Sequence, residues 1–237
     1  QPIFFADGRK VRGAEALVRW NSKELGFVSP AEFIPMAEET GRINEIGKWV
    51  MNEACKTLAQ NNLGTKQPYI MAINVSAIQL KEDTFFSEVC DVVKETRISA
   101  EWIELEITET AFIGRLEETI AILQRLKESG VNIALDDFGT GYSSLSYLHG
   151  LPIDTLKIDR SLIADVLENK KAQAMLHGII ELSKELGLQA VAEGIETIEQ
   201  AEIIQSTGCN YCQGYLFKKP LSKVDLVEFL IFSSDGN

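Results

Sequence analysis

The side chains best able to do chemistry in this chain occur at or near the ends of short segments with the composition of β-strands. They are five carboxylates, two amides and one lysine: Glu15, Asn74, Glu106, Asp136, Asp137, Lys157, Glu193 and Gln213. In segment 102–107, Ile103, Leu105 and Ile107 alternate with Glu106, so Glu106 is expected on the opposite face of the strand. Apolar neighbours flank Asn74 and Lys157 in the same way, which predicts that these polar side chains share one interior.

Five carboxylates that converge raise one another's pKa and repel unless cations lie among them. Two divalent cations would balance the charge of these carboxylates and Lys157, leaving a site ready to accept an anion. Every candidate ligand is an oxygen, counting the amide of Asn74, which predicts Mg²⁺ or Mn²⁺ rather than zinc. The adjacent Asp136 and Asp137 suit two ions about 3.5–4 Å apart.

Such a site predicts hydrolysis of a phosphoester, because paired ions lower the pKa of a shared water and stabilise the leaving alkoxide. Lys157 would hold that water in line, and Arg19 could contact a phosphate through two hydrogen bonds. A magnesium barrel of the enolase type, with Lys157 as a base, is the more distant alternative. The paired aspartates and Arg19 favour phosphate.

Eight predicted strands position these residues, at 2–5, 14–19, 69–75, 102–107, 131–136, 155–158, 189–193 and 210–215. The segments between them have helical periodicity, as at Leu116, Ile120, Leu123 and Leu126. Ser29 followed by Pro30 and Glu32, and Thr197 followed by Gln200, have the pattern of helix N-caps.

The alternation predicts an α/β protein with the TIM-like (β/α)8 barrel, whose usual size is about 250 residues. An open doubly wound sheet is the alternative that strand number does not exclude. Asp7-Gly8 joins the first two strands with no room for a helix, which predicts a hairpin and an antiparallel first strand. Residues 1–237 are expected to form a single domain, with the active site where barrels place it, at the carboxyl ends of the strands.

Composition excludes several classes of function. The chain has 237 residues, a formal net charge of −12 and 45% hydrophobic residues, as expected for a globular domain. The acidic balance argues against binding of a nucleic-acid polymer or direct contact with an anionic membrane. With no signal-peptide pattern, cytoplasmic localisation and reduced cysteines are expected. Cys209 and Cys212 form only half of a four-ligand zinc motif and are interpreted as ordinary thiols, although a redox role stays open.

Eight motifs in order give the chain its resemblance to a known family. Glu15-Ala16-Leu17-Val18-Arg19 resembles the motif that names the EAL domains, the cyclic di-GMP phosphodiesterases of bacterial signalling. The other seven are FIPMAEETG at 33–41, INVS at 73–76, EITE at 106–109, DDFGTGYSSL at 136–145, LKID at 156–159, AEGIE at 192–196 and QGY at 213–215. The resemblance covers essentially the whole chain and supports the barrel with an antiparallel first strand.

The resemblance implies cleavage of cyclic di-GMP to linear 5′-pGpG with two metal ions, Mg²⁺ or Mn²⁺. The oxygen ligands themselves predict that Ca²⁺ binds but inhibits, because a larger ion relaxes the geometry that in-line attack requires. The implied metal ligands are Glu15, Asn74, Glu106 and Asp136 for the first ion, and Asp136, Asp137 and Glu193 for the second. Lys157 and Gln213 would place the attacking water, which makes Lys157, Glu15, Asp137, Gln213 and Glu193 the expected catalytic residues. The implied substrate contacts are Leu17, Arg19, Pro35, Glu38 and Gln213.

The segment after Asp137 resembles the loop that positions this aspartate in EAL domains and lies near their dimer interface. The implied loop-positioning residues are Glu109, Phe138, Gly139, Thr140 and Gly141. The resemblance therefore implies a homodimer. The first predicted strand begins at residue 2, which suggests that the chain is a domain excised from a longer signalling protein, cytoplasmic or anchored to a membrane, in which a sensory or GGDEF domain could lie upstream.

The main alternative is a catalytically silent EAL domain that binds cyclic di-GMP as a receptor. Such members usually lack a metal ligand or the lysine. All of the implied metal ligands, from Glu15 to Glu193, and Lys157 are present here, which favours turnover.

Overall fold

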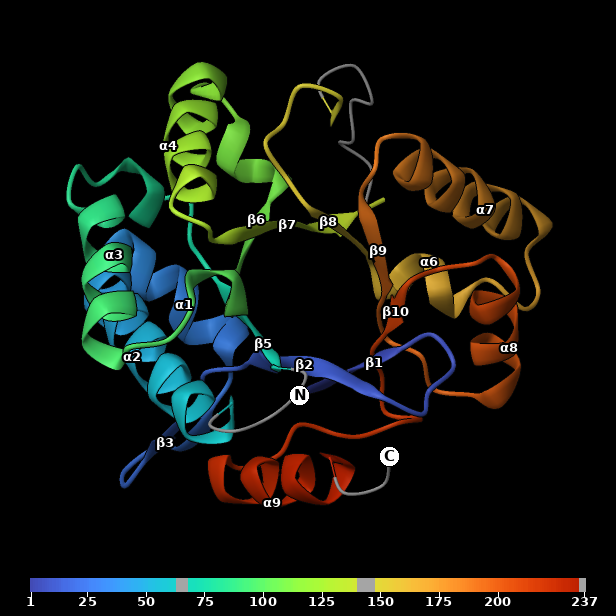
Figure 1. Cartoon of the computed structure of the whole chain (residues 1–237), viewed down its shortest axis with the longest axis horizontal. Coiled ribbons are helices and arrows are strands. Elements are labelled where there is room, and N and C mark those ends of the chain that lie inside the picture. The colour runs from blue at the N-terminus through green and yellow to red at the C-terminus, as the bar shows by residue number, and fades with distance from the viewer. Residues whose placement is uncertain (63–67, 140–147, 235–237) are drawn as a thin grey trace.

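In the computed structural model, residues 1–62, 68–139 and 148–234 are described, and eight of their strands close into a barrel (Figure 1). The barrel strands are β1 (Pro2–Phe5), β2 (Val11–Ala16), β5 (Ile70–Asn74), β6 (Ile103–Thr108), β7 (Asn132–Phe138), β8 (Thr155–Ile158), β9 (Gln189–Ala192) and β10 (Tyr211–Cys212). Their order around the barrel is β1-β10-β9-β8-β7-β6-β5-β2. The predicted TIM-like barrel is confirmed, and the open sheet is excluded.

The first strand is antiparallel to both of its neighbours, β2 and β10, whereas all other neighbours in the barrel are parallel. The turn between β1 and β2 contains Gly8 at φ +68°, where its backbone N–H donates to the carbonyl of Phe5 at 2.8 Å. A left-handed conformation is accessible to glycine at little cost, so this two-residue signal fixes the hairpin.

Helices surround the barrel (Figure 1). They are α1 (Pro30–Glu39), α2 (Ile43–Asn62), α3 (Phe85–Thr96), α4 (Leu116–Glu128), α6 (Arg160–Ala164), α7 (Lys170–Glu185), α8 (Ile198–Ser206) and α9 (Lys223–Ser234). The predicted caps form: Ser29 and Thr197 each make a complete capping box. No helix in the described part of the chain is long and apolar enough to cross a bilayer.

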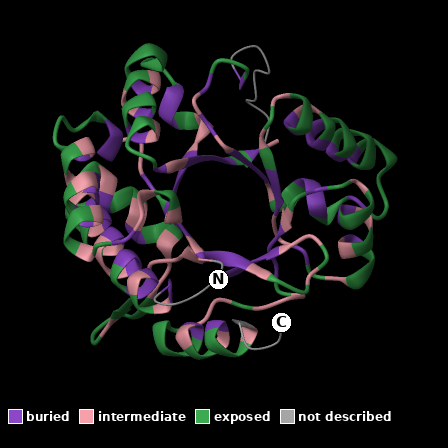
Figure 2. Cartoon of the chain, viewed as in Figure 1, coloured by how far each residue is buried: buried purple, intermediate pink, exposed green. Residues whose placement is uncertain are grey.

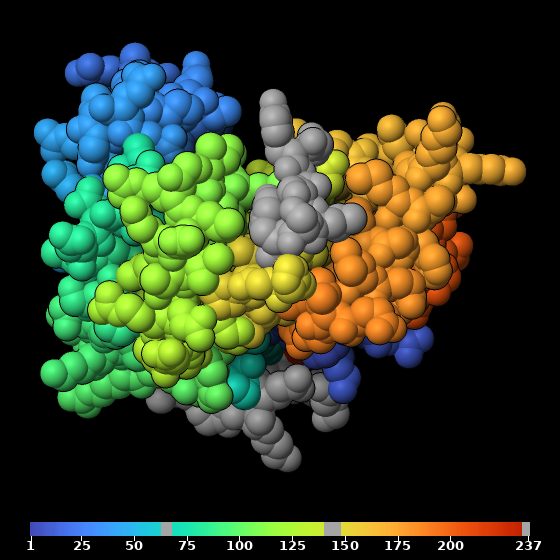
Figure 3. Space-filling model, turned by 90° about the horizontal axis from the view of Figure 1, so that it is seen from above, coloured from blue at the N-terminus to red at the C-terminus, as the bar shows by residue number. Residues whose placement is uncertain are grey.

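The predicted bounds of two strands were wrong by three residues, whereas the other strands differ by two residues or fewer at either end. The second strand begins at Val11 and ends at Ala16, instead of covering 14–19, and the last one comprises only Tyr211 and Cys212. After β2 the chain leaves the barrel and forms a separate hairpin of β3 (Trp20–Ser22) and β4 (Gly26–Val28), which the sequence interpretation did not predict. In Figure 3 this hairpin and α1 lie in blue at one corner of the molecule.

The main core lies between the barrel and the helices, and the ring of strands is buried while the outer faces of the helices are exposed (Figure 2). The strand residues that face this core include Ile73, Leu105, Ile107, Leu135 and Ile158, all at most 1% exposed. A second, small cluster of Ile3, Ala72 and Val191 is formed by the opposite faces of β1, β5 and β9. Polar residues occupy much of the remaining interior.

Candidate active site

Strand alternation places Glu106 and Lys157 inside the barrel, as predicted. Glu106 on β6 and Lys157 on β8 are each 1% exposed, while Leu105 and Ile158 beside them belong to the helix-facing core. Nζ of Lys157 lies 2.6 Å from Oε1 of Glu106. A charged lysine enclosed by a barrel requires such partners, because an unpaired ion there would be very costly.

A β-bulge in β7 places two consecutive aspartates opposite the same residue of β8. Leu135 of β7 pairs with Leu156 of β8, but the next pair joins Phe138 to Ile158, so that Asp136 and Asp137 together stand opposite Lys157. Asp137 adopts a left-handed conformation at φ +57°, which is uncommon for a residue other than glycine. Without the bulge, simple alternation would send Asp137 to the helix-facing side.

Glu15, near the end of β2, is held by two amides. Asn74 donates from Nδ2 to Oε1 of Glu15 at 2.7 Å, and Gln213 donates from Nε2 to Oε2 at 2.8 Å. Gln213 also donates to Oε1 of Gln1 at 3.2 Å. Because Asn74 uses its nitrogen on Glu15, its amide oxygen is the atom left to bind a cation.

Lys157 is the centre of this cluster. Its Nζ lies 2.7 Å from Oε1 of Glu193, 3.3 Å from Oδ2 of Asp136 and 4.0 Å from Oε1 of Glu15, in addition to the contact with Glu106. Burial alone would lower the pKa of Lys157, but the surrounding carboxylates, Glu106 first, raise it well above its usual value. The lysine is therefore charged at neutral pH.

The carboxylates respond differently to the shared space. Burial and repulsion by neighbouring carboxylates outweigh the attraction of Lys157 and raise the pKa of Glu106 well above its usual value. The same causes raise the pKa of Glu193 to about 7. For Glu15, burial is outweighed by Lys157 and the amides of Gln213 and Asn74, and its pKa is lowered. The pKa of Asp137 is raised by burial, then by Asp136 and Asp159.

The donor atoms of this cluster, carboxylate and amide oxygens, are those that divalent cations such as Mg²⁺ prefer. Oε2 of Glu106 is buried and accepts no hydrogen bond, while Oε1 of Glu106 and Oε1 of Glu193 lie 2.6 and 2.7 Å from Nζ of Lys157, so these buried oxygens need a positive partner. Lys157 supplies that positive partner in this structure. Among the described residues, no group of three or more His, Cys, Asp or Glu side chains is arranged to hold a metal ion. Binding of ions here would require the carboxylates to turn from Lys157 toward the metal.

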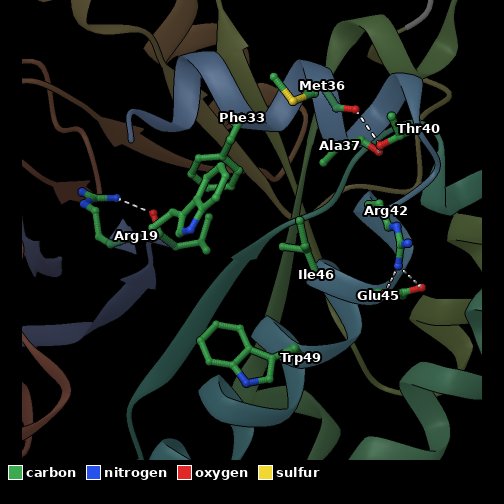
Figure 4. Close-up of a pocket in the computed structure, with 11 residues that line it drawn as sticks. Arg19, Phe33, Met36, Ala37, Thr40, Arg42, Glu45, Ile46 and Trp49 are labelled. Carbon is green, nitrogen blue, oxygen red and sulfur yellow. Dashed lines mark hydrogen bonds and ion pairs between the residues drawn. The ribbon is translucent and has the colours of Figure 1, made fainter. Parts of the chain in front are cut away.

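Two cavities, of about 300 and 350 Å³, reach Glu15 of the cluster. The one of about 300 Å³ is lined by Glu15, Asp137, Glu193 and Gln213 among others. A larger and mostly apolar cavity of about 520 Å³ lies between β3, α1 and α2 and is lined by Trp20, Phe33, Met36 and Trp49 among others (Figure 4). The chemistry belongs to the smaller cavity, because the larger one contains none of the candidate metal ligands.

The predicted substrate residues lie around these cavities. Leu17 lines the acidic cavity, and Arg19 lines the apolar one, where its Nη1 donates to the carbonyl of Val18 at 2.9 Å (Figure 4). Pro35 and Glu38 are in α1, and Oε1 of Glu38 accepts from the hydroxyl of Ser76 at 2.6 Å. Their contacts with substrate are predictions.

The predicted loop-positioning residues lie at the end of β7 or just after β6 and β7. Glu109 begins a 3₁₀ turn that ends at Phe112, directly after β6. Phe138 is buried at the end of β7, and Gly139 follows it at φ +105°. Thr140 and Gly141 lie outside the described residues.

Sequence interpretation missed a second ion pair inside the barrel. Arg12 donates to both oxygens of Glu104, at 2.8 and 2.6 Å, and Oε2 of Glu104 also accepts from the hydroxyl of Thr155 at 2.7 Å. Glu104 shares the alternation of Glu106, so its inward direction was legible in the sequence. The inward direction of Arg12 was not legible, because Arg12 is the extra residue of another bulge, in β2. There Ile3 of β1 pairs with Gly13 and Phe4 pairs with Val11.

The structure belongs to the class of closed β/α barrels. Its buried carboxylates and lysine lie at the carboxyl ends of the strands, where barrel enzymes have their active sites. The chain belongs to the EAL domain family, whose family model matches residues 1–220.

Among known proteins, the chain is similar to "Cyclic di-GMP phosphodiesterase NbdA" of Pseudomonas aeruginosa, with 40% identity over 97% of this chain. It spans only 29% of that relative's length. Among solved structures it resembles "PaMucR Phosphodiesterase, c-di-GMP complex", with a TM-score of 0.91 and 37% identity over 95% of this chain and 92% of that chain. It also resembles Klebsiella pneumoniae BlrP1 in a "calcium/cy-diGMP complex", with a TM-score of 0.82 and 28% identity over 94% of this chain and 55% of that chain.

Proposed function

We propose that this domain hydrolyses cyclic di-GMP to linear 5′-pGpG with the help of two divalent ions, Mg²⁺ or Mn²⁺. The observation that carries the proposal is the gathering of Glu106, Glu193 and Asp136 around Lys157 within 3.3 Å, with Glu15 fixed by Asn74 and Gln213 beside them. The named activity of NbdA supports the choice of substrate.

The proposed ligands are those expected from the sequence. Glu15, Asn74, Glu106 and Asp136 would hold one ion, and Asp136, Asp137 and Glu193 the other. When bound, the ions would polarise the phosphoryl oxygens and lower the pKa of the attacking water.

The chain's own residues would complete the reaction. Lys157 would donate a hydrogen bond to the attacking water and hold it in line with the phosphorus, and Gln213 would help to place it. Arg19, Leu17, Pro35 and Glu38 would orient the dinucleotide. Water adds across one phosphodiester: its oxygen bonds to phosphorus, the bond from phosphorus to the 3′ oxygen breaks, and a proton goes to that oxygen.

The test is incubation of the purified domain with cyclic di-GMP and Mg²⁺, followed by chromatographic detection of pGpG. Formation of pGpG that stops in EDTA and resumes with Mg²⁺ is the expected result. Binding of cyclic di-GMP without turnover at any metal concentration would identify the receptor alternative and overturn the enzymatic one.

Four further expectations are part of the proposal. We infer that the domain forms a homodimer through the region of Glu109 and Phe138, and that Ca²⁺ binds but inhibits. We also infer that it works in the cytoplasm, and that it belongs to a longer signalling protein with a sensory or GGDEF domain. The short share of NbdA that the chain spans supports the last point. Light scattering of the purified domain tests its oligomeric state.

A further inference from the structure

We propose that Glu38 and Ser76 form a positioning bridge that holds the metal ligand Asn74 in place, and that Glu38 influences metal affinity without touching the metal. The inference rests on the proposed metal-dependent function. It concerns a residue otherwise expected to contact the substrate.

Asn74 is the last residue of β5, where the regular ladder ends. The N–H of Val75 still donates to the carbonyl of Glu106 at 2.9 Å, but from Ser76 onward the chain leaves the barrel. A ligand at such a point depends on whatever fixes the next few residues. An ion that replaced Lys157 as partner of Glu15 would need the amide of Asn74 at a defined distance.

Ser76 is fixed through all of its polar atoms. Its hydroxyl donates to Oε1 of Glu38 at 2.6 Å and accepts from the N–H of Ile78 at 3.1 Å. Its own N–H donates to Oε1 of Gln79 at 3.1 Å, and its carbonyl accepts from the N–H of Gln79 at 3.0 Å and of Leu80 at 3.3 Å. Five hydrogen bonds on one residue make it the anchor of the segment that follows Asn74.

One of these bonds ties the anchor to a distant element. Glu38 lies 38 positions before Ser76, in the last turn of α1, whereas the other partners are within four residues. Phe33, Met36 and Ala37 of α1 line the apolar cavity in Figure 4, while Glu38 reaches to the end of β5. The bond is short and involves a carboxylate, which makes it one of the stronger hydrogen bonds in the region.

A second contact, made by Gln79 with α2, also fixes the position of Ser76. Gln79 is 5% exposed and packs against α2 at Gly47, where a Cβ would come within 2.0 Å of Nε2 of Gln79. Gly47 therefore leaves the space that Gln79 needs in order to reach the N–H of Ser76. The residues beyond Asn74 are thus held from two sides, by α1 through Glu38 and by α2 through Gln79.

The experiment measures Mn²⁺ binding by isothermal titration calorimetry, without nucleotide, in the wild-type domain and in Glu38→Ala, Glu38→Gln and Ser76→Ala. Loss of an outer hydrogen bond to a metal site weakens metal affinity by 10- to 100-fold in comparable sites. Because Ser76 is two residues from Asn74, we expect a loss of about tenfold, at the lower end of that range, in Glu38→Ala and Ser76→Ala. The double variant should lose no more than Ser76→Ala, which already removes the bond to Glu38 together with the bond from the N–H of Ile78.

Glu38→Gln separates the hydrogen bond from the charge. Its amide oxygen still accepts from Ser76, so the Mn²⁺ affinity should stay within about twofold of wild type. Glu39→Ala, which removes the neighbouring exposed carboxylate, is the matched control and should leave Mn²⁺ affinity unchanged. Thermal unfolding of each variant confirms that it folds.

Three results would overturn the inference. Glu38→Ala with wild-type Mn²⁺ affinity and a raised KM for cyclic di-GMP would leave Glu38 with its proposed substrate contact alone and without a positioning role. Equal losses in Glu38→Ala and Glu38→Gln would assign the effect to charge. Normal Mn²⁺ affinity in Ser76→Ala would remove the bridge. If the wild-type domain binds no Mn²⁺, the proposed metal-dependent function fails first, which is a distinguishable outcome.

Discussion

Nζ of Lys157 lies 2.6 Å from Oε1 of Glu106 inside the barrel, although the two residues come from strands separated by β7 and by 51 positions in the chain. Both side chains are at most 2% exposed. The pair joins a carboxylate whose pKa is raised by burial to a lysine whose pKa is raised by its carboxylate neighbours. It therefore supplies both a proposed metal ligand and the group proposed to hold the water.

Lys157→Ala should lower kcat for cyclic di-GMP by about 100-fold or more, the usual contribution of a positioned proton-transfer or water-holding group. KM should change much less, because Lys157 is proposed to act on the water and not on the nucleotide. Steady-state kinetics at saturating Mg²⁺ measure both constants. Lys127→Ala, which removes a half-exposed lysine paired with Asp154, is the control. Equal losses in kcat and in affinity would contradict the assigned role.

Glu15→Ala should abolish tight Mn²⁺ binding and lower turnover by orders of magnitude. Glu15 is a proposed ligand, and its removal also releases Asn74 and Gln213, which both donate to it. Calorimetric titration with Mn²⁺ measures the first effect, and pGpG formation the second. Near-normal turnover in this variant would remove Glu15 from the site.

Replacing Mg²⁺ by Ca²⁺ should preserve binding of cyclic di-GMP and suppress its hydrolysis. Ca²⁺ takes 6–8 oxygen ligands at longer distances than Mg²⁺ requires, which relaxes the geometry needed for in-line attack. Binding is followed by calorimetry and turnover by chromatography, with each ion at saturation. Robust pGpG formation in Ca²⁺ would refute this prediction.

The metal-free domain should become less stable as the pH rises from about 5 to 7. Glu193 has a pKa raised to about 7 in the fold, with burial as the first cause, against a usual value of 4.5. Between these values the folded state binds more protons than the unfolded state, so the free energy of unfolding falls as pH rises. Thermal unfolding in EDTA across this range measures the effect, and Mg²⁺ added at pH 7.5 should raise the melting temperature.

The control for this pH dependence is Glu193→Gln, which cannot ionise at that position. Its melting temperature in EDTA should fall less between pH 5 and 7 than that of the wild type. An identical slope in the two proteins would show that other groups, such as Glu106, account for the whole dependence.

Removing one partner of the Arg12–Glu104 pair should destabilise the domain by about 3–5 kcal/mol, since it leaves a buried charge uncompensated. Arg12→Ala and Glu104→Ala are compared by urea unfolding, with Glu45→Ala as the control because its ion pair with Arg42 is exposed. Exposed pairs contribute about 0–1 kcal/mol. A loss below about 1 kcal/mol in both core variants would show that the pair is dispensable.

Much of this protein was legible in the sequence because strand periodicity and turn chemistry are local. Ile103, Leu105 and Ile107 fixed the direction of Glu106, and Asp7-Gly8 fixed the hairpin that reverses the first strand. The cap pattern at Ser29 set the start of α1. The ordered motifs predicted the family, and the family model confirmed it.

Two features depended on how the strands pair, and a third on how a helix packs against a strand end. Arg12 and Asp137 face their partners only because bulges at Ile3/Phe4 and Leu135/Phe138 break the two-residue period, and a bulge is a property of two strands together. The bridge from Glu38 to Ser76 joins a helix to a strand end far along the chain.

The sequence by itself determined the eight strands, the residue types at their ends and hence the acidic, oxygen-rich character of the site. Only the tertiary structure decided which of those side chains meet, that Lys157 is their common partner and that Asn74 is held through Ser76. The reason is physical: periodicity says which way a side chain points from its own strand, whereas closure of the barrel sets the distances between strands.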